Sequence, residues 1–75
     1  MSDEEGGGYP ESDPRYHVVR IRAQLDAARR HARDDAGKVD EPRAQALFET
    51  TAEVLGGLIT AYEHYERGTE PAWRR

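Results

Sequence analysis

The stretch that decides the fold lies in the middle of the chain and reads Ala36-Gly37-Lys38-Val39-Asp40-Glu41-Pro42. Glycine often follows the last turn of a helix in the left-handed conformation, so we expect Gly37 to end a helix. Asp40 is a preferred N-cap residue, and a proline in the first helical turn loses no hydrogen bond. These features predict that a second helix begins at about Glu41. A connection of about four residues, 37–40, makes the two helices antiparallel neighbours.

The segment before this connection has the spacing of an amphipathic helix. Asp13 and Pro14 supply an N-cap and a first helical residue, which predicts a helix over 14–36. Its apolar residues recur at intervals of three and four and share one stripe: Val18, Ile21, Leu25, Ala28 and Ala32. A row of alternating charges is expected to pair along the solvated side: Arg22, Asp26, Arg30 and Asp34.

The segment after the connection predicts a longer helix over 41–67, with Gly68 as its C-cap. Its apolar stripe is wider than the one on the first helix and includes Ala44, Leu47, Phe48, Thr51, Val54, Leu55, Leu58, Ile59, Tyr62 and Tyr65. The first helix thins to alanine after Leu25 and cannot cover all of this stripe. At about 25 cal/mol per Å², the uncovered surface is worth several kcal/mol.

This excess of apolar surface predicts self-association. The expected fold is all-α, an antiparallel two-helix hairpin over 13–68 that dimerises into a four-helix bundle. A glycine inside a helix costs about 1 kcal/mol relative to alanine, and close approach of a second backbone would explain Gly57. The residues that we assign to the contact with the second copy are Phe48, Leu55, Gly57, Ile59 and Tyr62.

The two ends of the chain differ from its helical part. Residues 1–12 combine clustered acidic side chains with three consecutive glycines, which predicts a disordered acidic tail. Residues 69–75 contain the only tryptophan, Trp73. We expect this C-terminal tail to fold back over the end of the bundle. In the alternative interpretation Trp73 is an anchor for a larger protein partner.

Composition excludes several classes of function. The chain has 75 residues, a net charge of −4 and no cysteine. No apolar run is long enough for a membrane span, and we expect a cytoplasmic protein. The negative net charge argues against nucleic-acid binding. The arginines of the first helix are expected instead to pack over the second helix, with Arg15 near Tyr62 and Arg29 near Phe48.

The sequence has no nucleophile motif and no phosphate-binding loop, so we expect no enzymatic activity and no cofactor. His17, His64 and Glu63 lie near the open end of the hairpin and are the candidates for a metal site. Because nitrogen and oxygen sites need three or four converging ligands, we favour the interpretation that the two histidines cover the bundle end.

The short hairpin with Glu49, Glu53 and Glu63 resembles the layout of half-bundle ferritin-like proteins. The resemblance implies a di-iron site at a dimer interface. Such sites use a Glu-x-x-His motif, and no glutamate here is followed by histidine three residues later.

The sequence therefore predicts a small helical interaction or scaffold protein that binds itself and a larger protein. The alternatives are a metal-binding or ferritin-like four-helix protein and a nucleic-acid-associated regulator.

Overall fold

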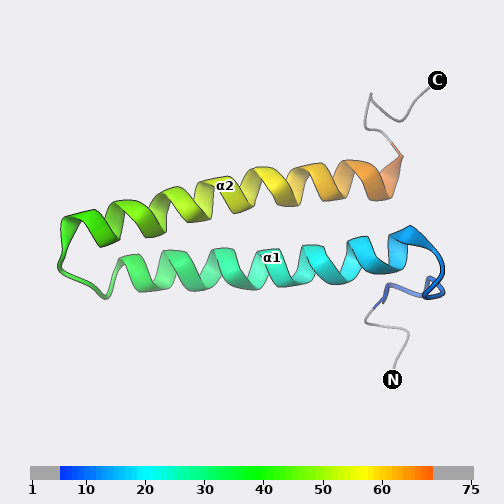
Figure 1. Cartoon of the computed structure of the whole chain (residues 1–75), viewed down its shortest axis with the longest axis horizontal. Helices are drawn as coiled ribbons and strands as arrows, with labels where there is room; N and C mark the ends of the chain where they lie inside the picture. Colours follow the sequence, from blue (N-terminus) through cyan, green and yellow to red (C-terminus); the bar gives the residue numbers. More distant parts are fainter. Residues whose placement is uncertain (1–5, 69–75) are drawn as a thin grey trace.

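The computed structural model describes residues 6–68, which form two long α-helices, α1 (Pro14–Ala36) and α2 (Pro42–Arg67). The helices lie side by side and antiparallel, with the connection at one end of the hairpin and the start of α1 and the end of α2 at the other (Figure 1). No strand occurs within residues 6–68. The predicted all-α hairpin is confirmed, and both helix spans agree with the sequence to within one residue.

The helix starts follow capping chemistry. The Asp13 carboxylate accepts a hydrogen bond from the backbone N–H of Arg15 at 2.9 Å, so the predicted N-cap of α1 is confirmed. The predicted N-cap of α2 was Asp40, and this is wrong by one residue. Glu41 has the extended backbone of a cap, and its longer side chain reaches the backbone N–H of Ala44 at 2.9 Å.

The two helix ends differ in their backbone. Gly68 has φ 71° and ψ 24°, the left-handed C-cap that the sequence predicts. Gly37 instead has φ −82° and ψ −6°, so the expectation that it is left-handed is wrong. Its N–H donates to the carbonyl oxygen of Asp34 at 3.2 Å, and Lys38 donates to Asp35 at 3.0 Å. The last turn of α1 thus tightens into a 3₁₀-type turn, in which each N–H donates to the carbonyl oxygen three residues earlier. This turn needs no residue with positive φ.

The core between the helices is thin. Ala36, Ala52 and Ile59 are the buried hydrophobic residues of the described part of the chain. Each helix packs along a row spaced by three and four residues, which we call the contact row: Val18, Arg22, Leu25, Arg29, Ala32 and Ala36 on α1, and Gln45, Phe48, Ala52, Leu55, Ile59, Tyr62 and Glu66 on α2. Ile21, expected within the packed stripe, lies beside this row and is 39% exposed.

Arg22 belongs to the contact row, which corrects its predicted place on the solvated side. Its Nη2 lies 3.3 Å from Oε1 of Glu66 on α2, so it pairs across the helices. The long aliphatic stem of arginine covers surface that alanines leave open. One predicted pair of the charge row is confirmed, because Asp26 contacts Arg30 at 2.9 Å, whereas Asp34 pairs with Lys38 at 3.0 Å.

The axial register differs from the expected one. Arg29 lies beside Gly56, whereas the sequence interpretation placed it beside Phe48, about two helical turns away. Figure 1 shows the reason, because the first turns of α2 extend past the end of α1 at the connection. Because the connection continues in the direction of the α1 axis before the chain turns back, α2 begins beyond the end of α1. Phe48 stays half-buried in the contact row, whereas Leu47 beside it is 61% exposed.

The turns that precede α1 pack on its first two turns. Gly6 is buried against the ring of Tyr16, and a side chain at Gly7, which has φ 64°, would contact Val19. Arg15 lies over the ring of Tyr9, with its guanidinium carbon 4.3 Å from the ring centroid. The expected contact of Arg15 with Tyr62 is therefore replaced by one with Tyr9. Disorder of residues 1–12 stays a prediction, and residues 1–5 lie outside the described part.

Candidate interaction surface

The hairpin has two broad faces of opposite character. On each helix, the residues that come directly after contact-row residues in the sequence lie on one face of the hairpin. A groove of about 440 Å³ on this face is lined by such residues from both helices: Ala23, Asp26 and Arg30 of α1, and Gly56, Thr60 and Glu63 of α2. We call this side the charged face. Because the helices are antiparallel, the residues that come directly before contact-row residues in the sequence lie together on the opposite face of the hairpin. We call this face the apolar face.

The apolar face holds every large hydrophobic residue that is exposed within residues 6–68. Leu47 is 61% exposed, Val54 58%, Leu58 44% and Ile21 39%. Each of them directly precedes a contact-row residue, so they lie together along one side of the hairpin. Scattered apolar residues are normal on a protein surface, but a concentration on one face marks an interaction site.

The predicted interface residues divide into three groups. Phe48, Leu55 and Tyr62 are half-buried in the contact row, so part of each side chain stays accessible. Ile59 is only 8% exposed because it packs against α1, which corrects the expectation that α1 leaves it uncovered. Gly57 is exposed, and no atom lies within 4 Å of the position that a Cβ on it would take. Nothing within the hairpin therefore requires glycine at position 57.

Sequence reasoning missed Leu47, Val54 and Leu58 as the most exposed apolar residues. It included them in the wide stripe of the second helix but assigned the interface to the other edge of that stripe. Leu47, Val54 and Ala61 recur every seven residues, which is a signal for one line along a helix. That line alone could not reveal which edge α1 covers, because coverage depends on how α2 is rotated about its own axis.

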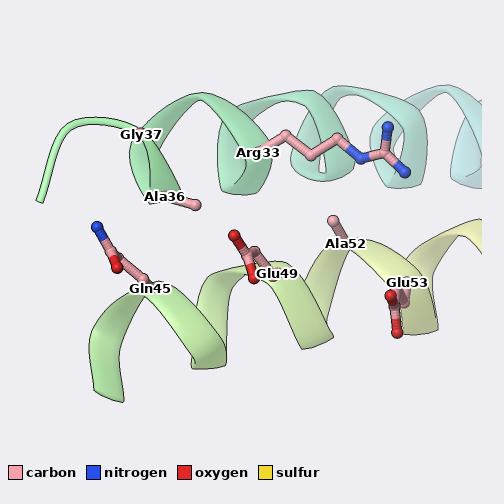
Figure 2. Close-up of a pocket in the computed structure, with 7 residues that line it drawn as sticks. All are labelled: Arg33, Ala36, Gly37, Gln45, Glu49, Ala52 and Glu53. Carbon is pink, nitrogen blue, oxygen red and sulfur yellow. The ribbon is translucent and has the colours of Figure 1, made fainter. Parts of the chain in front are cut away.

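A second groove, of about 570 Å³, lies on the charged face near the connection. Figure 2 shows Ala36 and Ala52 pointing into the space between the helices. Arg33 comes from α1, and Glu49 and Glu53 come from α2. Because the groove combines charges of both signs, it has no single-sign field that would collect phosphate groups or cations.

The candidate metal ligands do not converge. Within residues 6–68 no group of three or more histidine, cysteine, aspartate or glutamate side chains could hold a metal ion. His17 Nε2 donates to the carbonyl oxygen of Glu11 at 2.8 Å, and Glu63 lines the charged-face groove with Arg22 and Arg30. His31 is exposed and lies 2.9 Å from Asp35.

Two ionisable pairs at helix ends have shifted pKa values. The hydrogen bond from the Arg15 side chain lowers the pKa of Asp13, and the backbone N–H of Arg15 adds to this effect. The hydrogen bond to Asp34 raises the pKa of Lys38. The two pairs lie at opposite ends of α1, and the Asp13 carboxylate also caps the helix start. Neither arrangement places a base beside a nucleophile.

Comparison with known families, curated proteins and solved structures gives no match to this chain. Neither α1 nor α2 is long and apolar enough to cross a membrane. Trp73, which the alternative interpretation makes an anchor for a larger partner, lies outside the described residues. The apolar face is therefore the candidate site that the described residues provide.

Proposed function

We propose that this chain is a non-enzymatic cytoplasmic interaction protein that self-associates into a four-helix bundle and presents that bundle to a larger protein. The observation that carries the proposal is the concentration of Ile21, Leu47, Val54 and Leu58 on one face of a hairpin with a thin core. Hydrophobic burial is the main favourable term in protein association, and this face has the composition for it.

The size of the apolar face supports a dimer. Helices of 23 and 26 residues, each about 10 Å across with a rise of about 1.5 Å per residue, present a face of about 700 Å². A stable interface uses about 800 Å² from each partner. The apolar residues of this face also supply the core that two helices alone lack.

Sedimentation equilibrium of the wild-type chain over a range of concentrations tests this function. We expect a mass of twice 8.5 kDa, with dissociation on dilution. Leu58→Glu places a charge on the apolar face and should give a helical monomer or a strongly weakened dimer. Thr60→Glu is the matched control, because Thr60 is two residues away on the same helix but lines the charged face. It should leave the dimer unchanged.

A wild-type chain that stays an 8.5 kDa monomer with full helicity at hundreds of micromolar would contradict self-association. Equal dimerisation of the two variants would contradict the assignment to the apolar face. Affinity purification with the intact chain, compared with the Leu58→Glu variant, tests whether a larger protein recognises the bundle.

A further inference from the structure

We propose that the second copy docks with its α2 on α2 of the first copy, antiparallel, about a two-fold axis beside Val54. This inference rests on the proposed function and adds which helix meets which. It follows from the different character of the two halves of the apolar face and from the position of Val54 within α2.

The two helices contribute unequal outer edges to the apolar face. On α2 this edge is formed by Leu47, Val54 and Ala61, which precede Phe48, Leu55 and Tyr62 of the contact row. We call these three residues the outer row. The matching positions on α1 precede Val18, Leu25 and Ala32, and they are all polar: His17, Gln24 and His31.

This asymmetry selects the partner of α2. If α2 packed on α1 of the second copy, Leu47 and Val54 would face histidine and glutamine side chains. Packing of α2 on α2 places apolar residues against apolar residues and leaves the polar edges of α1 together at the solvent. Leu47 and Val54 are the most exposed large hydrophobic residues that the structure describes, so this pairing removes the most apolar surface from water.

The position of Val54 favours an antiparallel pair. α2 spans Pro42–Arg67, so Val54 lies at its midpoint and an axis there overlaps the full length of both helices. The axis places Val54 on Val54 of the second copy and Leu47 on Ala61, which packs a large side chain against a small one. A parallel pair would place Leu47 on Leu47 and Ala61 on Ala61, and would align the two helix dipoles unfavourably.

Gly57 supplies an independent reason for close approach on this side. The space around its missing side chain is open, although glycine costs about 1 kcal/mol inside a helix. In the proposed pair Gly57 lies next to Leu58, at the axial height of Thr51 of the second copy. The residues Val54, Gly57, Leu58 and Ala61 have the i, i+3, i+4, i+7 spacing that surrounds a hole for an inserted side chain.

Disulfide trapping tests this arrangement, because the chain has no cysteine of its own. Single-cysteine variants are equilibrated in a glutathione redox buffer, in which two thiols become one disulfide as oxidised glutathione is reduced. Disulfides form where Cα atoms lie about 4.4–6.8 Å apart. We expect Val54→Cys to crosslink with itself. A mixture of Leu47→Cys and size-tagged Ala61→Cys should give the mixed disulfide at least about tenfold above either self-disulfide.

Three outcomes would overturn the inference. Self-disulfides of Leu47→Cys and of Ala61→Cys in excess of the mixed product would indicate a parallel pair. A mixed disulfide of Val54→Cys with Gln24→Cys would place α2 on α1 of the second copy. If Val54→Cys crosslinks no more strongly than the charged-face control Thr60→Cys, Val54 does not lie at the contact between the two copies.

Sedimentation of the same variants in reductant separates this inference from the proposed function. A reduced dimer with the wrong crosslinks contradicts only the docking geometry. A reduced monomer contradicts self-association itself.

Discussion

Arg29 lies across α2 at Gly56, with its Nη1 3.7 Å and its Cδ 3.9 Å from the position that a Cβ on Gly56 would take. These are ordinary van der Waals separations, so a methyl group fits between the helices without displacing the arginine. We therefore predict that Gly56→Ala stabilises the chain by about 1 kcal/mol, because alanine gains helix propensity over glycine. Urea denaturation followed by circular dichroism measures the change. A loss of stability would show that Arg29 packs more tightly on Gly56 than these distances indicate.

The same contact shows what the sequence could and could not predict. Helix spans and antiparallel packing followed from local signals, namely Asp13, Pro14, Pro42 and Gly68, and each acts within one turn of its own helix. The register does not follow from local signals. It depends on how far α2 extends past α1 at the connection, and that distance is set by backbone conformation over residues 37–41. The register expected from the sequence is wrong by about two helical turns, which is why it places Arg29 beside Phe48 instead of Gly56.

The rotation of α2 about its own axis decides how much of the candidate site could be predicted. A wide apolar stripe on the second helix was predictable from the spacing of Leu47 through Tyr65. Which edge of that stripe stays exposed depends on which residues α1 covers. The structure buries Ile59 and leaves Leu47 and Val54 exposed. The sequence therefore predicted that the second helix has an apolar stripe, but not which edge of that stripe is exposed.

Ala52 is the most buried hydrophobic residue of the described chain, with 2% of its surface exposed. We predict that Ala52→Leu destabilises the hairpin by about 1–3 kcal/mol, because the added carbon atoms must push the helices apart. Ala46→Leu is the matched control, since Ala46 is exposed on the same helix, and its effect should stay within about 0.5 kcal/mol. Thermal melts of both variants at one protein concentration measure the difference. Equal effects would mean that the helices do not approach closely at Ala52.

Arg22 combines a favourable contact with an unfavourable one. Its Nη2 pairs with Glu66 at 3.3 Å, but its Nε is buried and makes no hydrogen bond. An ion pair in which both side chains are partly exposed contributes about 0–1 kcal/mol, and an unsatisfied buried donor costs about 1–3 kcal/mol. We predict that Arg22→Met, which keeps the aliphatic stem, leaves stability unchanged or raises it by up to about 1 kcal/mol.

Arg22→Ala removes the stem as well and should lower stability by about 1 kcal/mol, since the packing of the stem is lost. Chemical denaturation of the two variants distinguishes packing from charge. If methionine is as harmful as alanine, the ion pair with Glu66 contributes more than its partial exposure indicates.

Acid should weaken the start of α1 through Asp13. The Arg15 side-chain hydrogen bond, followed by the hydrogen bond from the Arg15 backbone, lowers the pKa of this carboxylate in the folded chain. A group with a lowered pKa stabilises the fold above its unfolded pKa of about 3.9, and this contribution is lost as pH falls through the folded pKa. We therefore predict that helicity at the start of α1 decreases below about pH 4.

Asp13→Asn isolates this effect, because asparagine is also a good N-cap but carries no charge. The wild-type chain should be more stable than the variant at pH 7, and the difference should shrink as the pH falls below about 4. Denaturation curves of both chains at pH 7, 5, 4 and 3 measure it. The raised pKa of Lys38 acts in the opposite range, since its contribution is lost only as the pH rises past about 10. A stability difference that stays constant from pH 7 to pH 3 would show that Asp13 acts as a neutral cap and that its charge contact with Arg15 adds nothing.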